Sequence, residues 1–132
     1  MEEIITLGRL GDGMIIALGE AEENHLILSD NKQDSFSNYT NSLQQEFKPD
    51  QWETATIESA TCNAVVLCTD GISDDILPEK QMSFAQELYS TYANLDSKGR
   101  KRDLKRWLNE WPVPRHSDDK TIACLFKKGE PK

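Results

Sequence analysis

The stretch 65–71, Val-Val-Leu-Cys-Thr-Asp-Gly, decides the fold, because an apolar run ends there in a carboxylate and a glycine. Residues 64–69 are almost wholly apolar, which is typical of a central strand buried on both faces. The final glycine allows a sharp turn of the backbone. Asp70 therefore ends a rigid strand. It begins an acidic cluster with Asp74 and Asp75, and such a cluster is unfavourable unless a cation or water offsets the like charges.

Short apolar runs on both sides of this stretch predict further strands. On the N-terminal side, Gly, Asp and Asn residues separate the runs. We expect these first strands to form an antiparallel meander, because their connections are too short for a helical crossover. The predicted strands are residues 4–7, 14–18, 25–28, 53–58 and 121–126.

Two later segments have the 3.6-residue period of helices. Residues 83–93 place apolar side chains at helical spacing, and Ser83 with Gln86 has the spacing of a capping box. Residues 101–111 predict a second helix with an apolar face and a basic face. The basic face consists of Lys101, Arg102, Lys105 and Arg106. Helices and antiparallel strands are segregated, so we predict an α+β fold in a single domain, 1–132.

Charge and composition limit the classes of partner. The net charge of −8 argues against nucleic acid or an anionic membrane as the main partner. No apolar run approaches the roughly 20 residues of a membrane span. The acidic start, residues 1–5, lacks the basic region of a signal peptide, so we expect a cytoplasmic protein. The three cysteines have no zinc-motif spacing, and we expect them to be reduced.

Three short segments place an aspartate beside glycine, or beside another aspartate, next to a predicted strand. These aspartates are Asp12, Asp70 and Asp118. Mg²⁺ and Mn²⁺ prefer carboxylate and water oxygens as ligands. If the strands next to Asp70 and Asp118 pair, both carboxylates could converge on one cation. The alternative is that each is a turn residue, since Asp-Gly is a very common turn dipeptide.

The order of these segments resembles that of the protein phosphatase 2C family. Residues 65–74 resemble its strand and Ser/Thr-Asp-Gly-x-x-Asp motif, and residues 118–121 resemble its C-terminal Asp-Asn-x-Thr motif, here as Asp-Asp-Lys-Thr. Residues 11–13 resemble its Gly-Asp-Ser segment, with glycine in place of serine. Residues 36–40 look like the Asn-x-Thr segment of a bacterial branch. The resemblance covers nearly the whole chain. In the intact family two antiparallel sheets form a sandwich flanked by helix pairs, and the resemblance implies that this chain supplies part of that sandwich.

The resemblance also implies roles for individual residues. Asp70 and Asp118 match carboxylates that bind the second metal of a two-metal centre holding Mg²⁺ or Mn²⁺, and Asp12 matches an aspartate of a weaker, third site. Asp74 and Gly71 match positions that support the direct ligands. In such enzymes the metals activate a water that attacks the phosphorus of a phosphoserine or phosphothreonine in a phosphoprotein substrate. That scheme has no covalent phosphoenzyme, so the cysteines need no role.

One departure from the family concerns its N-terminal half. The acidic pair and the Asp-Gly-His-Gly-Gly segment of the family, which supply bridging ligands, a phosphate-binding arginine and a general-acid histidine, are not in this sequence. We therefore expect the chain to correspond to the C-terminal half, with no catalytic residue of its own. It would act as a homodimer or with a complementing N-terminal half. A catalytically inactive binding or regulatory module is the alternative, and a plain acidic structural domain is a third.

The remaining polar candidates have simpler interpretations. Arg9 and Arg115 could meet a phosphate, but lone arginines are usually solvated. His25 is expected to be a cross-strand surface residue and His116 a loop residue. The packing residues of the two predicted helices are expected to include the aromatic side chains of Phe84, Tyr92, Trp107 and Trp111.

Overall fold

A computed structural model describes residues 3–29, 52–111 and 119–127. Antiparallel sheets and helices make up this part of the chain, which confirms the α+β prediction. The strands are β1 (Ile4–Arg9), β2 (Met14–Gly19), β3 (Leu26–Leu28), β4 (Glu53–Glu58), β5 (Cys62–Cys68) and β6 (Ile122–Phe126). The helices are α1 (Asp70–Ser73), α2 (Gln81–Tyr92) and α3 (Ser97–Asn109), with short 3₁₀ turns at Glu22–Asn24, Ser59–Thr61 and Pro78–Lys80.

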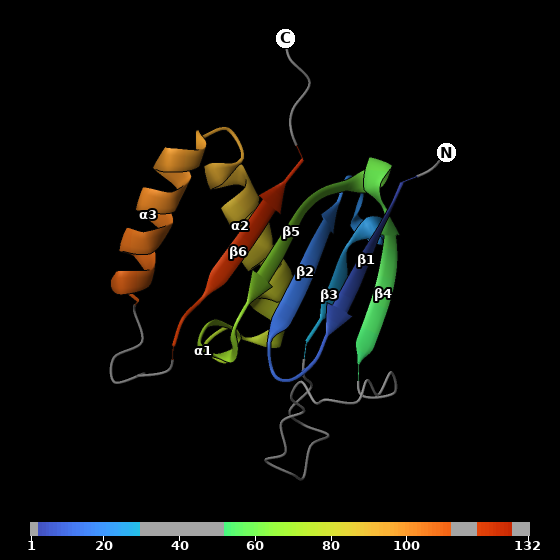
Figure 1. Ribbon diagram of the computed structural model, residues 1–132, viewed down its shortest axis with the longest axis horizontal. Helices are drawn as coiled ribbons and strands as arrows, with labels where there is room; N and C mark the ends of the chain where they lie inside the picture. The colour runs from blue at the N-terminus through green and yellow to red at the C-terminus, as the bar shows by residue number, and fades with distance from the viewer. Residues whose placement is uncertain (1–2, 30–51, 112–118, 128–132) are drawn as a thin grey trace, which may run out of the picture.

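The strands form two sheets, shown in Figure 1. One has the order β3-β2-β5-β6, so β5 is a central strand as predicted. The other pairs β1 with β4. The predicted meander of the first strands is therefore wrong at β1, which does not pair with β2. Gly11, with a φ of 94°, lets the chain turn between the two sheets, so the side chains of β1 and β2 meet face to face.

Two apolar clusters hold three layers together. The first lies between the sheets and consists of Leu7, Ile15, Ala17, Leu28, Cys62 and Val65. The second lies on the other face of the four-stranded sheet, under the helices. Its buried members are Met14, Ile16, Leu18, Ala64, Val66, Cys68, Ile72, Ala85, Leu88 and Tyr92. Because β2 and β5 contribute to both clusters, the four-stranded sheet is the central layer.

Both long helices begin earlier than the sequence pattern predicts. The 3₁₀ turn Pro78–Lys80 leads directly into α2, so Ser83 lies inside the helix and the predicted capping box is wrong. Helix α3 is capped by Asp96, whose carboxylate accepts a 2.7 Å hydrogen bond from the backbone N–H of Gly99. The predicted apolar face of α3 packs on the second cluster as expected.

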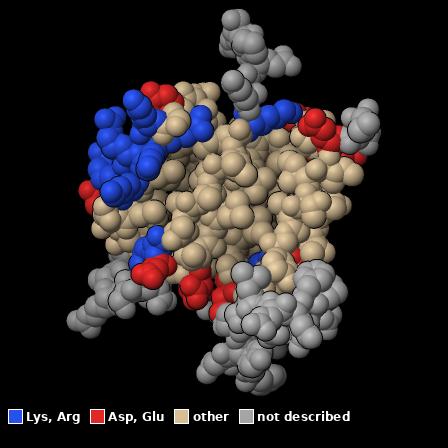
Figure 2. All heavy atoms as spheres, in the orientation of Figure 1, with Lys and Arg blue, Asp and Glu red and all other residues tan. Residues whose placement is uncertain are grey.

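Part of the central sheet is not covered by the small sheet. On this face Leu125 of β6 is 66% exposed. In the two-stranded sheet, Ile4 of β1 is 64% exposed and alternates with Ile5 and Leu7, which pack between the sheets. Figure 2 shows that the same face carries few charged side chains over β5 and β6. A pocket of about 280 Å³ opens between β1 and these strands, lined by residues that include Ile5, Val65 and Leu125. Among the described strands, β1 has β4 on one side and no strand on the other.

Lys127, the residue after β6, is hydrogen-bonded to residues at the start of β5 and just before it. The backbone N–H of Lys127 donates to the carbonyl of Asn63 at 2.8 Å, and its Nζ donates to the carbonyl of Ala60 at 2.9 Å. Lys127 is thus an ordered neighbour of the turn before β5. In the described ranges, no helix is long and apolar enough to cross a membrane.

Candidate functional site

One end of the four-stranded sheet brings the acidic turns together. Met14, the first residue of β2, pairs with Cys68, the last residue of β5, and Cys68 also pairs with Ile122, the first residue of β6. Asp12, just before β2, and Asp70, just after β5, therefore lie at the same end of the sheet. Figure 2 shows acidic side chains at this end. Asp118 falls outside the described residues, as do Arg115, His116 and the segment 36–40.

Thr69 joins the end of β5 to the segment that leads into β6. Its backbone N–H donates to the carbonyl of Thr121 at 3.1 Å. Its hydroxyl donates to the carbonyl of Asp119 at 3.1 Å and accepts from the N–H of Thr121 at 3.0 Å. The residue next to Asp118 is thus fixed against the residue next to Asp70. The sequence motif contained Thr69, but only the structure shows this bonding.

Asp70 is the first residue of α1, a short helix that turns back over the sheet end. Gly71 and Ile72 are buried, and Asp70 is half-buried. The backbone N–H of Asp74 donates to the carbonyl of Asp70 at 2.9 Å, so Asp74 lies one turn away with its side chain exposed. Asp75 accepts a 2.6 Å hydrogen bond from the indole Nε1 of Trp111. Trp111, predicted only to pack, therefore also engages part of the acidic cluster.

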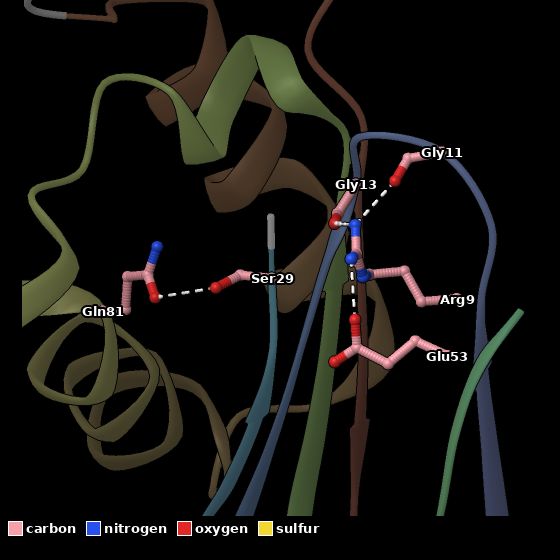
Figure 3. A network of polar contacts seen from close by, with 6 residues as sticks. All are labelled: Arg9, Gly11, Gly13, Ser29, Glu53 and Gln81. Atoms are coloured by element: carbon pink, nitrogen blue, oxygen red, sulfur yellow. Dashed lines mark hydrogen bonds and ion pairs between the residues drawn. The ribbon is translucent and has the colours of Figure 1, made fainter. Parts of the chain in front are cut away.

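Arg9 clamps the turn that carries Asp12, as Figure 3 shows. Its Nη1 donates to the carbonyls of Gly11 at 2.5 Å and Gly13 at 3.4 Å, and its Nη2 forms a 2.7 Å ion pair with Glu53. Arg9 and Glu53 are direct cross-strand partners of β1 and β4. The Arg9 side chain is only 13% exposed, so the expectation of a solvated arginine is wrong. Its Nε is buried without a hydrogen-bond partner among the described residues.

A second polar contact in Figure 3 ties the four-stranded sheet to the helices. The hydroxyl of Ser29, just after β3, donates to the side-chain oxygen of Gln81 at the start of α2, at 3.4 Å. Gln81 is itself buried. This contact positions α2 and does not touch the acidic turns.

A pocket of about 270 Å³ lies beside the clamped turn. Its lining includes Arg9, Gly13, Thr69 and Thr121. The residues of the Arg9 clamp and those bonded through Thr69 therefore line the same pocket. Gly13 has little spare room, because a Cβ placed there would lie 3.1 Å from the carbonyl oxygen of Cys68. This close approach gives a physical reason for glycine at the position where the family motif has serine.

The carboxylates that the structure describes have the right chemistry for Mg²⁺ or Mn²⁺. Hard divalent cations take oxygen ligands, which Asp12 and Asp70 offer at one sheet end. Within the ranges 3–29, 52–111 and 119–127, no three His, Cys, Asp or Glu side chains are grouped so that they could hold a metal ion. A complete centre would therefore require ligands beyond these residues.

The cysteines and His25 do not resemble a nucleophile and its base. Burial, and then the neighbouring Cys124, raise the pKa of Cys68 to about 12, and burial raises the pKa of Cys124 to about 11. Both remain protonated thiols at neutral pH, whereas the thiolate is the reactive form. His25 accepts a 2.9 Å hydrogen bond at Nδ1 from the N–H of Gly19, so it fixes the end of β2.

The protein is of the α+β class, with three layers and with Asp12 and Asp70 next to the ends of two adjacent antiparallel strands. The sequence profile of the family described as protein phosphatase 2C matches residues 2–109. The chain therefore belongs to the protein phosphatase 2C family. The match ends before Asp118 and its motif. Searches of curated proteins and of solved structures give no significant match.

Proposed function

We propose that this chain is the C-terminal half of a metal-dependent phosphoserine/phosphothreonine phosphatase. Asp70 and Asp118 would bind one Mg²⁺ or Mn²⁺ ion, and Asp12 would serve a weaker site. The observation that supports this most directly is the joining of β5 to β6 by Thr69, which holds the neighbours of both proposed ligands at one sheet end. When bound, the metals would supply an activated water and neutralise phosphate oxygens.

The side chains around the proposed ligands would orient them. The Arg9 clamp restrains the turn of Asp12 through two backbone carbonyls. The buried Gly71 and Ile72 anchor α1, so Asp70 starts from a fixed backbone position. Preorganised ligands bind a cation with less loss of conformational entropy than mobile ones.

We further propose that the missing ligands come from a second polypeptide, either another copy of this chain or a complementing N-terminal half. Two features support this proposal: the edge of β1 that has no partner among the described strands, and the exposed Leu125. Such edges and apolar faces are normally covered. Light scattering at micromolar concentration tests the homodimer, and a monomeric mass would contradict it.

A catalytically inactive binding or regulatory module is the second candidate. It is kept as the alternative because the acidic pair and the Asp-Gly-His-Gly-Gly segment of the family are not in this sequence. Hydrolysis of a phosphopeptide with Mn²⁺ separates the two candidates, when measured with and without a polypeptide that carries the family's Asp-Gly-His segment. We expect turnover only with the added polypeptide. Turnover by this chain alone would show that its own ligands suffice, and no turnover in either case would favour the inactive module.

Calorimetric titration with Mn²⁺ tests the metal site directly. We expect millimolar or tighter binding by the native chain, and its loss in Asp70→Asn. Asp75→Asn is the matched control, because Asp75 is an aspartate of the same turn region whose oxygen is already used by Trp111. An absence of binding by the native chain would refute the metal site, and equal effects of the two variants would refute the role of Asp70.

A further inference from the structure

Helix α3 concentrates positive charge on an acidic protein. Six of the chain's 15 lysines and arginines lie in this 13-residue helix, whereas the whole chain has a net charge of −8. The only acidic residue within the helix is Asp103. The remainder of the chain is therefore more acidic than its total charge suggests. Figure 2 shows the resulting cluster of basic side chains over α3.

Most of these charges share one face of the helix. At about 100° per residue, five of them fall within an arc of about 140°. They are Lys98, Lys101, Arg102, Lys105 and Arg106, and all five are exposed. Arg100 belongs to the opposite side, where its guanidinium lies 5.2 Å from the centroid of the Phe126 ring and donates to the carbonyl of Leu95 at 2.8 Å. We call the five exposed residues the basic face.

The basic face works against the stability of its own helix. Lys98 and Arg102, Lys101 and Lys105, and Arg102 and Arg106 are like-charged neighbours four residues apart, an arrangement that is destabilising. In the first turn, which contains no acidic residue, the charge of Lys98 opposes the helix dipole, whereas the capping Asp96 and Arg106 in the last turn complement it. Within the described residues, the only ion pair of the basic face joins Arg106 to Asp103 at 2.5 Å. Such repulsion is relieved when an anionic partner binds.

We propose that the basic face of α3 binds an acidic segment of another polypeptide. The helix is about 20 Å long, which an extended segment of about six residues would span. Carboxylates of such a segment would pair with the lysines and make bidentate contacts with Arg102. This role goes beyond phosphate-ester hydrolysis and does not depend on the metal site.

A short acidic segment fits the surroundings better than a larger polyanion. A nucleic acid or a membrane surface would also approach the acidic remainder of the chain and be repelled by it. The apolar face of α3 is already packed, since Leu104 and Leu108 contact the core under the sheet. The helix therefore has no free apolar side to insert into a bilayer.

Fluorescence anisotropy with a labelled glutamate-rich peptide at low salt tests the proposal. We expect saturable binding that weakens as salt rises. Lys101→Gln combined with Lys105→Gln should weaken binding on the order of fivefold. Each single variant should weaken it less, while Lys80→Gln, an exposed lysine of the 3₁₀ turn before α2, should leave it unchanged. Because the double variant removes like-charge repulsion, its melting temperature should not fall.

Three outcomes would overturn the proposal. The first is the absence of peptide binding. The second is a weakening by Lys80→Gln that equals the weakening by Lys101→Gln or Lys105→Gln. The third is that single-stranded RNA or anionic lipid vesicles bind through the same two lysines more tightly than the peptide does. A double variant that unfolds would not be interpretable alone, so each single variant is measured against Lys80→Gln, which carries the same change of charge and side chain.

Discussion

Trp111 donates a 2.6 Å hydrogen bond from its indole nitrogen to the carboxylate of Asp75, joining the residues after α3 to those after α1. One member of the acidic cluster is thus engaged by the protein itself. The Trp111 ring also meets Trp107 edge-on, with 4.9 Å between centroids. The contact fixes the position of α3 relative to the end of the sheet where the acidic turns lie.

Trp111→Phe should lower the free energy of unfolding by about 2 kcal/mol, because it removes a hydrogen bond to a charged acceptor and retains most of the ring packing. Urea unfolding measures the change. Trp107→Phe is the matched control, since Trp107 stacks on Phe84 with 5.9 Å between ring centroids, and within the described residues its indole makes no hydrogen bond to Asp75. If both variants lose equal stability, the hydrogen bond is not the cause.

Thr69→Val should lower the free energy of unfolding by about 1–3 kcal/mol. The valine keeps a branched side chain but removes the acceptor for the Thr121 N–H and the donor to the Asp119 carbonyl. Thr69→Ser retains the hydroxyl and should cost less. Thermal unfolding compares the variants, and amide exchange at Thr121 should be faster in the valine variant alone. Unchanged exchange would contradict the bonding described for Thr69.

Arg9→Met should lower the free energy of unfolding by about 1–2 kcal/mol and speed amide exchange at residues 11–13, because the clamp on two carbonyls is lost. Glu53→Gln tests the ion pair separately. Glu53 is 43% exposed, so its loss of charge should cost below about 1 kcal/mol. A larger effect for Glu53→Gln than for Arg9→Met would show that the clamp contributes little.

Alkaline pH should destabilise the protein. The pKa of Cys68 rises from 9.0 to about 12 on folding and that of Cys124 to about 11, because burial disfavours the thiolate. Burial, and then its hydrogen bond to Asp103, also raise the pKa of Tyr92 from 10.0 to about 12. Below pH 9 these groups are protonated in both states. Above it the unfolded state ionises first, so stability falls as the pH rises towards about 12.

Urea midpoints from pH 8 to 11 measure this effect, and Cys68→Ala should reduce the slope above pH 9. A stability that does not fall above pH 9, or a slope that Cys68→Ala leaves unaltered, would contradict the burial of these ionisable groups.

Local patterns in the sequence predicted most of the strands and both long helices, because burial of apolar side chains follows the same periods as the backbone. Pairing was harder to predict. The β1–β4 pair depends on Gly11 directing the chain into a second sheet, which only tertiary packing selects. The start of α2 cannot be predicted from a capping residue, because the 3₁₀ turn at Pro78 leads into the helix and no side chain caps it.

The candidate site can be predicted only in part from the sequence, for a related reason. Asp70 and Asp12 could be identified from their place beside apolar runs. The burial of Arg9 could not, since it depends on Glu53, which is 44 positions away and becomes its neighbour only through strand pairing. The hydroxyl of Thr69 likewise meets residues about fifty positions further along the chain.

That separation has a consequence for how the protein folds. Contacts between residues distant in the sequence generally form later than local ones, because a long loop must first be closed. Thr69 and Thr121 can meet only after the intervening helices α2 and α3 have been accommodated beside the sheet. A partly folded chain can therefore contain α2, α3 and the β2–β3 hairpin and still lack the junction beside Asp70. Recovery of helical signal during refolding would then precede recovery of the sheet end.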